Sequence, residues 1–301
     1  MEMLGKFLGC MLSAALGDAL GASIYSPRNL LCYTDDTAMM IALAEEMVES
    51  RGRLDPEKLA WRFVEAYERE PWRGYGPGPP RIFKLIKRGV GILELDRRLY
   101  PGGSFGNGGA MRIAPVGLFY HDDFEELRKA VEAACKPTHN HPLAVEGALI
   151  EAASIALALR VEPGERTRPD DFIEQLLNLA SSEVYRRKLT LIPRLLESNP
   201  SRKLIVRELG HSVEAHNSVP TAVYCYLLEQ DPIKSIRRAI WIGGDRDTIA
   251  CMAGAIAGAH RGAGSLPREY LDRLENADRI RRLAERLYEL RFGADRLPRE
   301  N

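Results

Sequence analysis

Apolar residues recur along most of this chain at the spacing of an α-helix. Amphipathic runs, in which charged residues fill the positions between apolar ones, occupy residues 124–134, 172–179 and 280–290. Stretches that are apolar at nearly every turn occupy residues 4–16, 142–160 and 218–229. Alternating patterns bounded by hairpin turns, which are typical of strands, are nearly absent. The pattern therefore predicts an all-α fold, a compact bundle of about a dozen helices.

Three loops interrupt these helices, at residues 24–37, 73–80 and 100–115. Residues 160–171 are charged and contain prolines, which indicates a connection on the surface. The helical patterning on both sides of this connection is alike, and the chain has no internal repeat or low-complexity tail. We therefore expect one domain over residues 1–301.

Composition narrows the range of partners. The 301 residues carry 42 basic and 42 acidic side chains, so nothing indicates nucleic-acid binding. The five cysteines are scattered through mostly apolar segments, as expected of reduced core residues in a cytoplasmic protein. The apolar N-terminus is interrupted by Asp18, and residues 249–259 are too few to span a bilayer. We expect a cytoplasmic monomer with no membrane partner.

Two acidic clusters each precede an apolar helix. The first cluster is Thr34-Asp35-Asp36-Thr37, and the second is Asp245, Asp247 and Thr248 with Arg246 between the acids. Helix capping is the simpler explanation for either cluster alone, since Thr and Asp are favoured at helix starts. A cap needs one side-chain oxygen, however, and each cluster offers more.

Both clusters adjoin helices that are apolar on most faces, so their carboxylates are expected to be buried. Buried neighbouring carboxylates repel one another unless a cation neutralises them. Carboxylate and hydroxyl oxygens suit a hard cation such as Mg²⁺ or Mn²⁺. If the two helix starts meet in space, the sequence predicts a site for two divalent ions.

A glycine-rich loop, GGSFGNGGA, occupies residues 102–110. Its backbone N–H groups have the freedom to turn toward a phosphate, and Phe105 offers a ring on which a base can stack. A long flexible turn is the alternative interpretation. His139 and His141 lack the further ligands of a zinc site, so a polar contact to substrate or a helix cap is preferred for them.

Six motifs, in order, resemble the ADP-ribosylglycohydrolase family: GDALG, YTDDTAM, GSFGNGGAMRIAP, THNHPLAVEGA, SVPTAVYCYL and GGDRDTIACMAGAIAGA. They extend from about Gly9 to about Gly264, and RGYGPG and SVPTAVYCYL are most similar to the ADP-ribosyl-serine hydrolase branch. The resemblance implies a compact all-helical fold with two Mg²⁺ or Mn²⁺ ions between the acidic clusters. It also implies a hydrolase that cleaves the C1″ bond of ADP-ribosylated side chains.

The resemblance assigns site residues by motif position. The implied metal ligands are Thr34, Asp35, Asp36, Asp245, Asp247 and Thr248. The implied substrate-binding residues are Gly103, Ser104, Phe105, Gly106, Asn107, His139 and Val213. Asp18 matches a family aspartate with a supporting role near the metals.

Two positions depart from the family pattern. The branch carries a glutamate after its GD motif, whereas the matching position here is Tyr25 and no acid lies between Asp18 and Asp35. Asp36 or Asp247 would then act as the catalytic base, or the protein would bind ADP-ribose as a reader with little or no turnover. Arg246 replaces a small residue between the aspartates, and we expect it to point away from the metals. Hydrolysis of another ribosyl conjugate is a third interpretation.

Overall fold

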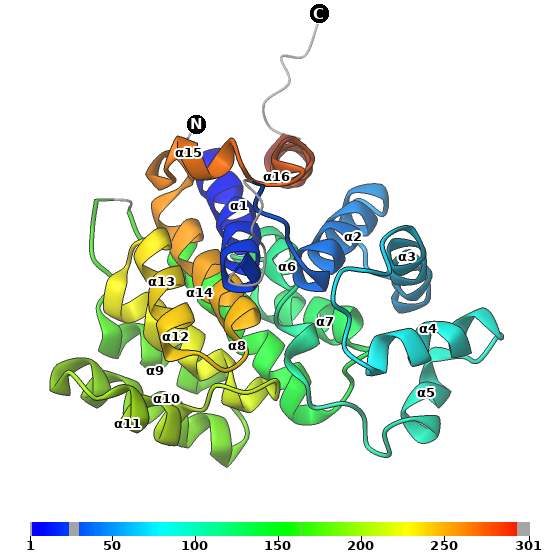
Figure 1. Cartoon of the computed structure of the whole chain (residues 1–301), viewed down its shortest axis with the longest axis horizontal. Helices are drawn as coiled ribbons and strands as arrows, with labels where there is room; N and C mark the ends of the chain where they lie inside the picture. Colours follow the sequence, from blue (N-terminus) through cyan, green and yellow to red (C-terminus); the bar gives the residue numbers. More distant parts are fainter. Residues whose placement is uncertain (1, 24–29, 163, 294–301) are drawn as a thin grey trace, which may run out of the picture.

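The computed structural model describes residues 2–23, 30–162 and 164–293, and in this part of the chain the fold is all-α (Figure 1). The described residues form sixteen α-helices, more than the dozen predicted. In chain order they are α1 (Glu2–Ala22), α2 (Asp35–Glu49), α3 (Pro56–Arg69), α4 (Gly78–Lys87), α5 (Ile92–Arg98), α6 (Ala114–Phe119), α7 (Phe124–Cys135), α8 (Pro142–Leu159), α9 (Pro169–Leu179), α10 (Glu183–Ser198), α11 (Arg202–Leu209), α12 (Val219–Glu229), α13 (Pro232–Ile242), α14 (Arg246–Arg261), α15 (Arg268–Leu271) and α16 (Ala277–Phe292). Short 3₁₀ helices are η2 (Asn107–Gly109), η3 (Ala215–Asn217) and η4 (Ala263–Ser265).

The long helices lie where the apolar pattern predicts them, and the additional ones are short. The apolar runs at 142–160 and 218–229 are α8 and α12, and the connection at 160–171 separates α8 from α9. The short helices α4 and α6 begin inside two of the predicted loops. A helix of six to ten residues carries only two or three apolar repeats, so the periodic signal for it is weak.

Helix α1 runs through the middle of the fold and packs against α14, α16, α2 and α6 (Figure 1). The α1–α14 pair is antiparallel, because a Cβ atom added at Gly9 would meet Gly258 whereas one added at Gly21 would meet Asp247. At Gly17 such an atom would lie 2.1 Å from the carbonyl oxygen of Ala250. Glycines therefore let the two backbones touch, and the end of α1 comes to lie beside the start of α14.

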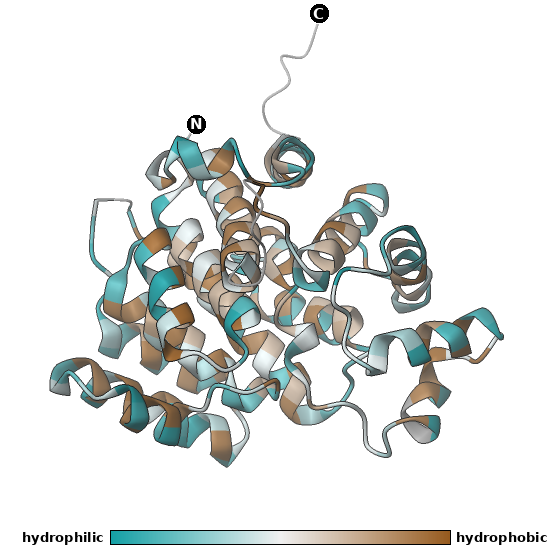
Figure 2. Cartoon of the chain, viewed as in Figure 1, coloured by the Kyte–Doolittle hydropathy of each residue, from teal (hydrophilic) through white to brown (hydrophobic). Residues whose placement is uncertain are grey.

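Two helices, α1 and α8, are long and apolar enough to cross a membrane by length and composition alone. Within their most apolar windows, 72% of the α1 residues and 83% of the α8 residues are buried inside the fold. Figure 2 shows hydrophobic residues gathered on the inner helices and hydrophilic ones on outer helices such as α16. Packing in the core accounts for the apolar character of both helices.

Candidate active site

The first acidic cluster is organised by Asp18, which lies near the end of α1 and is fully buried. The Asp18 carboxylate accepts hydrogen bonds from the backbone N–H groups of Thr34 and Thr37, at 3.0 Å each. It also accepts from their hydroxyl groups, at 2.8 Å and 2.6 Å. Thr34 is the N-cap residue of α2 and accepts from the N–H group of Asp36 at 3.4 Å. Thr34 therefore caps α2 while Asp18 anchors the start of this helix, and both contacts set the direction in which Asp35 and Asp36 project. The supporting role of Asp18 near metal ions stays a prediction.

The second acidic cluster is placed by a glycine turn before α14. Gly243 and Gly244 have φ angles of 80° and 76°, and a Cβ atom at Gly244 would lie 1.8 Å from the carbonyl oxygen of His211. That same oxygen accepts a hydrogen bond from the N–H group of Asp245 at 2.9 Å. Only glycine fits this turn, so the sequence dictates where α14 begins.

The two clusters meet because α1 touches both of them. Asp18 bonds to the start of α2, and Gly21, three residues later, contacts the backbone of Asp247 at the start of α14. Burial raises the pKa of Asp36 well above its ordinary value, and the charges of Asp18, Asp35, Asp247 and Asp245 raise it further. The predicted acids therefore lie within electrostatic range of one another.

The carboxylate and hydroxyl oxygens of the two clusters are of the type that divalent cations prefer. The Oδ2 atom of Asp36 is buried and has no hydrogen-bond partner among the described residues. Burial, and then the neighbouring carboxylates, raise the pKa of Asp35 to about 7, which indicates that negative charge accumulates here without sufficient compensation. Within the described ranges, however, no three His, Cys, Asp or Glu side chains gather tightly enough to hold one ion. The acids thus lie near one another and share uncompensated negative charge, but they do not form a closed metal-binding cage.

The glycine loop lies beside the second cluster. The side-chain amide of Asn107 donates hydrogen bonds to Oδ2 of Asp245 at 2.6 Å and to the hydroxyl of Ser218 at 3.2 Å. The N–H group of Asn107 donates to the carbonyl oxygen of Val213 at 2.9 Å. Asn107, predicted to contact substrate, therefore orients a predicted metal ligand.

Two of the residues predicted to bind substrate, Phe105 of this loop and Val213 of a neighbouring segment, lie on the surface. Phe105 is 47% exposed and Val213 is 61% exposed, and the two segments pair through the N–H group of Ala215 and the carbonyl oxygen of Phe105 at 3.0 Å. The Phe105 ring packs edge-on against His141, with 5.6 Å between ring centroids. An exposed aromatic ring on a paired backbone is available for stacking with a base.

His139 and His141 pack against the glycine loop. His141 caps α8 by accepting from the N–H group of Leu143 at 3.1 Å, which confirms the capping interpretation. The ring of His139 lies under Gly106 and Gly108, where added Cβ atoms would approach it to 3.3 Å and 2.4 Å. Burial lowers the pKa of His139 to about 3, so this ring is neutral near pH 7.

Gly103 has a φ angle of 87°, and a Cβ atom there would lie 2.5 Å from the backbone nitrogen of His141. This position accepts only glycine, and the residue is buried. Ser104 and Gly106 are half-buried, and the Ser104 hydroxyl accepts from the N–H group of Gly106 at 3.3 Å. These contacts give the loop a defined conformation in the fold, and whether it holds phosphate stays a prediction.

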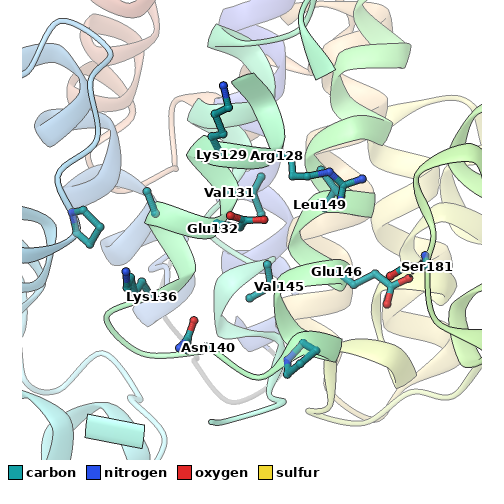
Figure 3. Close-up of a pocket in the computed structure, with 13 residues that line it drawn as sticks. Arg128, Lys129, Val131, Glu132, Lys136, Asn140, Val145, Glu146, Leu149 and Ser181 are labelled. Carbon is teal, nitrogen blue, oxygen red and sulfur yellow. Dashed lines mark hydrogen bonds between the residues drawn. The ribbon is translucent and has the colours of Figure 1, made fainter. Parts of the chain in front are cut away.

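A separate cavity of about 540 Å³ opens on the surface between α7 and α8 (Figure 3). Its lining combines basic, acidic and apolar side chains and contains none of the predicted site residues. It is lined by Pro56, Arg128, Lys129, Val131, Glu132, Ala133, Lys136, Asn140, Pro142, Val145, Glu146, Leu149 and Ser181. This cavity is therefore separate from the acidic clusters and the glycine loop.

Comparison with known proteins matches this architecture. The family model for ADP-ribosylglycohydrolase covers residues 1–296. The chain belongs to the ADP-ribosylglycohydrolase family. Two similar relatives are named ADP-ribosylhydrolase ARH3: the protein of Bos taurus is 34% identical over 95% of this chain and 93% of its own length, and that of Homo sapiens is 33% identical over the same shares.

A solved structure described as an "ADP-ribosylglycohydrolase-related protein complex" has the same fold. Its TM-score is 0.75 at 24% sequence identity, and the match covers 97% of this chain and 99% of that one. The all-helical ADP-ribosylglycohydrolase fold predicted from the sequence is therefore confirmed, as is the similarity to the serine-hydrolase branch.

Sequence reasoning missed Arg112, which holds the glycine loop of this ADP-ribosylglycohydrolase in place. Arg112 is fully buried and donates to the carbonyl oxygens of Gly108 and Ala134 at 2.6 Å and 2.9 Å, and to the hydroxyl of Thr138 at 2.7 Å. Its guanidinium also lies 4.6 Å from the ring centroid of Phe63. The signal for it was a single arginine inside the otherwise apolar stretch AMRIAP.

Two departures from the family pattern remain predictions. Tyr25 lies outside the described residues. Arg246 is half-buried at the first position of α14, and its predicted outward direction stays a prediction.

Proposed function

We propose that the protein is a metal-dependent hydrolase that cleaves the C1″ glycosidic bond of ADP-ribosylated protein side chains, or of related conjugates, and releases ADP-ribose. One observation carries the proposal: three helix ends bring Asp18 and the two acidic clusters together, next to the glycine loop. Family membership and the similarity to proteins named ADP-ribosylhydrolase support the same reaction class.

The residues that would hold two Mg²⁺ or Mn²⁺ ions are Thr34, Asp35, Asp36, Asp245, Asp247 and Thr248. The unpartnered Oδ2 atom of Asp36 and the mutual repulsion of the carboxylates support this assignment. When bound, such ions supply positive charge that orients ribose hydroxyls and makes a water molecule more acidic.

Hydrolysis adds the water oxygen to C1″ while the bond from C1″ to the side-chain atom breaks. Asp36 or Asp247 accepts one proton of the attacking water, and this proton passes on to the leaving side-chain atom. The same carboxylates stabilise the positive charge that develops on the ribose ring in the transition state. Asp247 is the more exposed of the two, so water reaches it more easily.

The glycine loop would bind the other half of the substrate. The N–H groups of Gly103, Gly106 and Asn107 already donate within the protein. The backbone N–H groups of Ser104 and Phe105 therefore suit the diphosphate, while the Phe105 ring and Val213 suit the adenine ring. His139, held neutral under the loop, keeps these groups in position.

Incubation with ADP-ribosylated peptides tests the proposal. Serine-linked, arginine-linked and polymeric substrates should be compared with Mg²⁺ and with EDTA, and free ADP-ribose measured by chromatography. We expect release from at least one linkage with Mg²⁺ and none with EDTA. Absence of release from every linkage would contradict the proposal.

A second candidate is an ADP-ribose reader. It is favoured by the stretch from residue 19 to residue 34, which contains no acid where the branch has its catalytic glutamate. Micromolar binding of ADP-ribose by calorimetry, without turnover of any of these substrates, would favour the reader over the hydrolase.

A further inference from the structure

Tyr75 lies in the loop between α3 and α4, and its ring is held by two other aromatic rings. It packs edge-on against Tyr67 of α3, with centroids 5.0 Å apart and an interplanar angle of 85°. It packs in the same manner against Phe83 of α4, at 6.2 Å and 83°. Contacts from two helices fix the ring, so the direction of its hydroxyl group is set before any ligand arrives.

The hydroxyl group of Tyr75 is buried and has no hydrogen-bond partner among the described residues. Burial raises the pKa of Tyr75 strongly, and the charge of Asp35 raises it further. The hydroxyl is therefore a donor at any physiological pH, within electrostatic range of the first acidic cluster. Buried donors without partners are rare, which points to a partner that arrives from outside the chain.

The loop that carries Tyr75 is bonded to the start of α2. The N–H group of Asp35 donates to the carbonyl oxygen of Arg73 at 2.8 Å. The Arg73 side chain is buried, donates to the carbonyl oxygen of Tyr33 at 3.0 Å, and is paired with the carboxylates of Glu70 and Glu275. Tyr75 follows Arg73 by two residues, so this network ties the backbone beside Tyr75 to the start of α2.

We propose that Tyr75 is a positioning residue whose hydroxyl donates a hydrogen bond to an oxygen of the sugar–diphosphate half of ADP-ribose, beside Asp35. This inference rests on the proposed function, because it takes ADP-ribose as the ligand. The Asp35 carboxylate itself is not bonded to the hydroxyl, although both groups are held in place. The proposal assigns the acceptor to the ligand.

The test compares Tyr75→Phe with Tyr67→Phe in the full chain. Tyr67→Phe removes a hydroxyl from the same aromatic cluster and serves as the matched control. Affinities for ADP-ribose and for AMP are measured by calorimetry in saturating Mg²⁺. AMP carries the adenine end but lacks the second phosphate and the second ribose.

We expect Tyr75→Phe to weaken ADP-ribose binding about five- to tenfold, the effect of one lost hydrogen bond, and to leave AMP binding unchanged. Its Tm should equal or exceed that of the unmodified protein, because the substitution removes a buried hydroxyl that has no partner. Tyr67→Phe should change neither affinity.

Three outcomes would overturn the inference. Equal ADP-ribose affinity in Tyr75→Phe and the unmodified protein would show that the hydroxyl contacts no ligand oxygen. Equal losses for ADP-ribose and AMP, or a lower Tm, would indicate a structural role. Weaker Mg²⁺ binding by Tyr75→Phe without nucleotide would assign the hydroxyl to the acidic cluster instead. If the unmodified protein binds no ADP-ribose, the proposed function fails together with this inference. If it binds ADP-ribose and Tyr75→Phe binds equally well, only this inference fails.

Discussion

The side-chain amide of Asn107 donates a hydrogen bond to Oδ2 of Asp245 at 2.6 Å, across 138 residues of sequence. This bond links the glycine loop to the second acidic cluster, so the predicted phosphate site and the predicted metal site share one rigid connection. Outer residues that orient metal ligands in this way affect metal affinity without touching the ion.

Asn107→Asp replaces that donor with a second carboxylate and should weaken Mg²⁺ binding about 10- to 100-fold, as loss of an orienting partner does. Repulsion between the two acids turns the Asp245 side chain away from the site. Calorimetric titration with Mg²⁺ measures the effect. Asn178→Asp, the same change at an exposed position of α9, is the control and should leave affinity unchanged. Wild-type affinity in Asn107→Asp would show that the bond does not orient a ligand.

Asp18→Asn should lower the free energy of unfolding by about 2–4 kcal/mol, since the amide turns a donor toward the donors of Thr34 and Thr37. Thr37→Val removes one of the hydroxyl bonds and should cost about 1 kcal/mol. Urea unfolding, followed by circular dichroism, compares the two. A loss for Asp18→Asn no larger than that for Thr37→Val would mean that Asp18 is not the residue that holds α2 to α1.

Relative to the unmodified protein, Asp36→Asn should be more stable without divalent cation and less stable with it. In EDTA at pH 8 the variant should be more stable by about 1–3 kcal/mol, because a buried acid with an unpartnered oxygen has been removed. In Mg²⁺ at 100 times its Kd the unmodified protein should gain about 2.7 kcal/mol and the variant much less. Thermal unfolding in both buffers checks this, with Asp170→Asn on the surface as control. If Mg²⁺ stabilises both proteins equally, Asp36 is not a ligand.

The apolar pattern predicted the long helices because each carries enough repeats to define a buried face. The glycines Gly258 of α14 and Gly17 of α1 let the backbones of these two helices touch. The acidic clusters were visible because several carboxylates next to apolar helices are unusual. Short helices such as α4 and α6 were missed, since six to ten residues give little periodicity.

The pattern of apolar and polar residues within one segment could not show which distant segments form hydrogen bonds with one another. The bond from Asn107 to Asp245 joins two motifs that were both recognised, but with different expected roles. Arg112 was not singled out because one charged residue in an apolar stretch does not indicate its partners. Lys188 was not singled out because it follows Arg186 and Arg187, where a further cation is expected to face solvent. Both prove to be buried and to hold loops of the site through carbonyl oxygens.

Lys188 supports the loop that carries Val213. Its ammonium group is buried and donates to the carbonyl oxygens of Leu209 and His216, at 2.9 Å and 2.6 Å, and to the side chain of Asn217 at 2.5 Å. Lys188→Met should release this loop and weaken ADP-ribose binding about tenfold, with a smaller effect on Mg²⁺ binding. Calorimetry with each ligand measures both. Lys203→Met, an exposed lysine of α11, is the control, and equal losses for the two ligands would indicate general unfolding instead.

Glu151 on α8 gives a stability prediction that is independent of the site. It is 1% exposed, neither carboxylate oxygen has a hydrogen-bond partner among the described residues, and burial raises its pKa well above 4.5. The unfolded chain releases this proton near pH 4.5 while the folded protein keeps it, so folding takes up one proton at higher pH. Stability should therefore fall by up to about 1.4 kcal/mol per pH unit from this group as pH rises above 4.5, until the folded pKa is reached.

Glu151→Gln cannot titrate, so its stability should exceed that of the unmodified protein by an amount that grows between pH 5 and pH 8. Urea unfolding at each pH measures this difference. Glu174→Gln, a substitution at an exposed position on α9, should show the same pH dependence of stability as the unmodified protein. A constant difference between Glu151→Gln and the unmodified protein over that range would show that Glu151 is ionised in the folded state. The buried carboxyl would then have a partner that neutralises it.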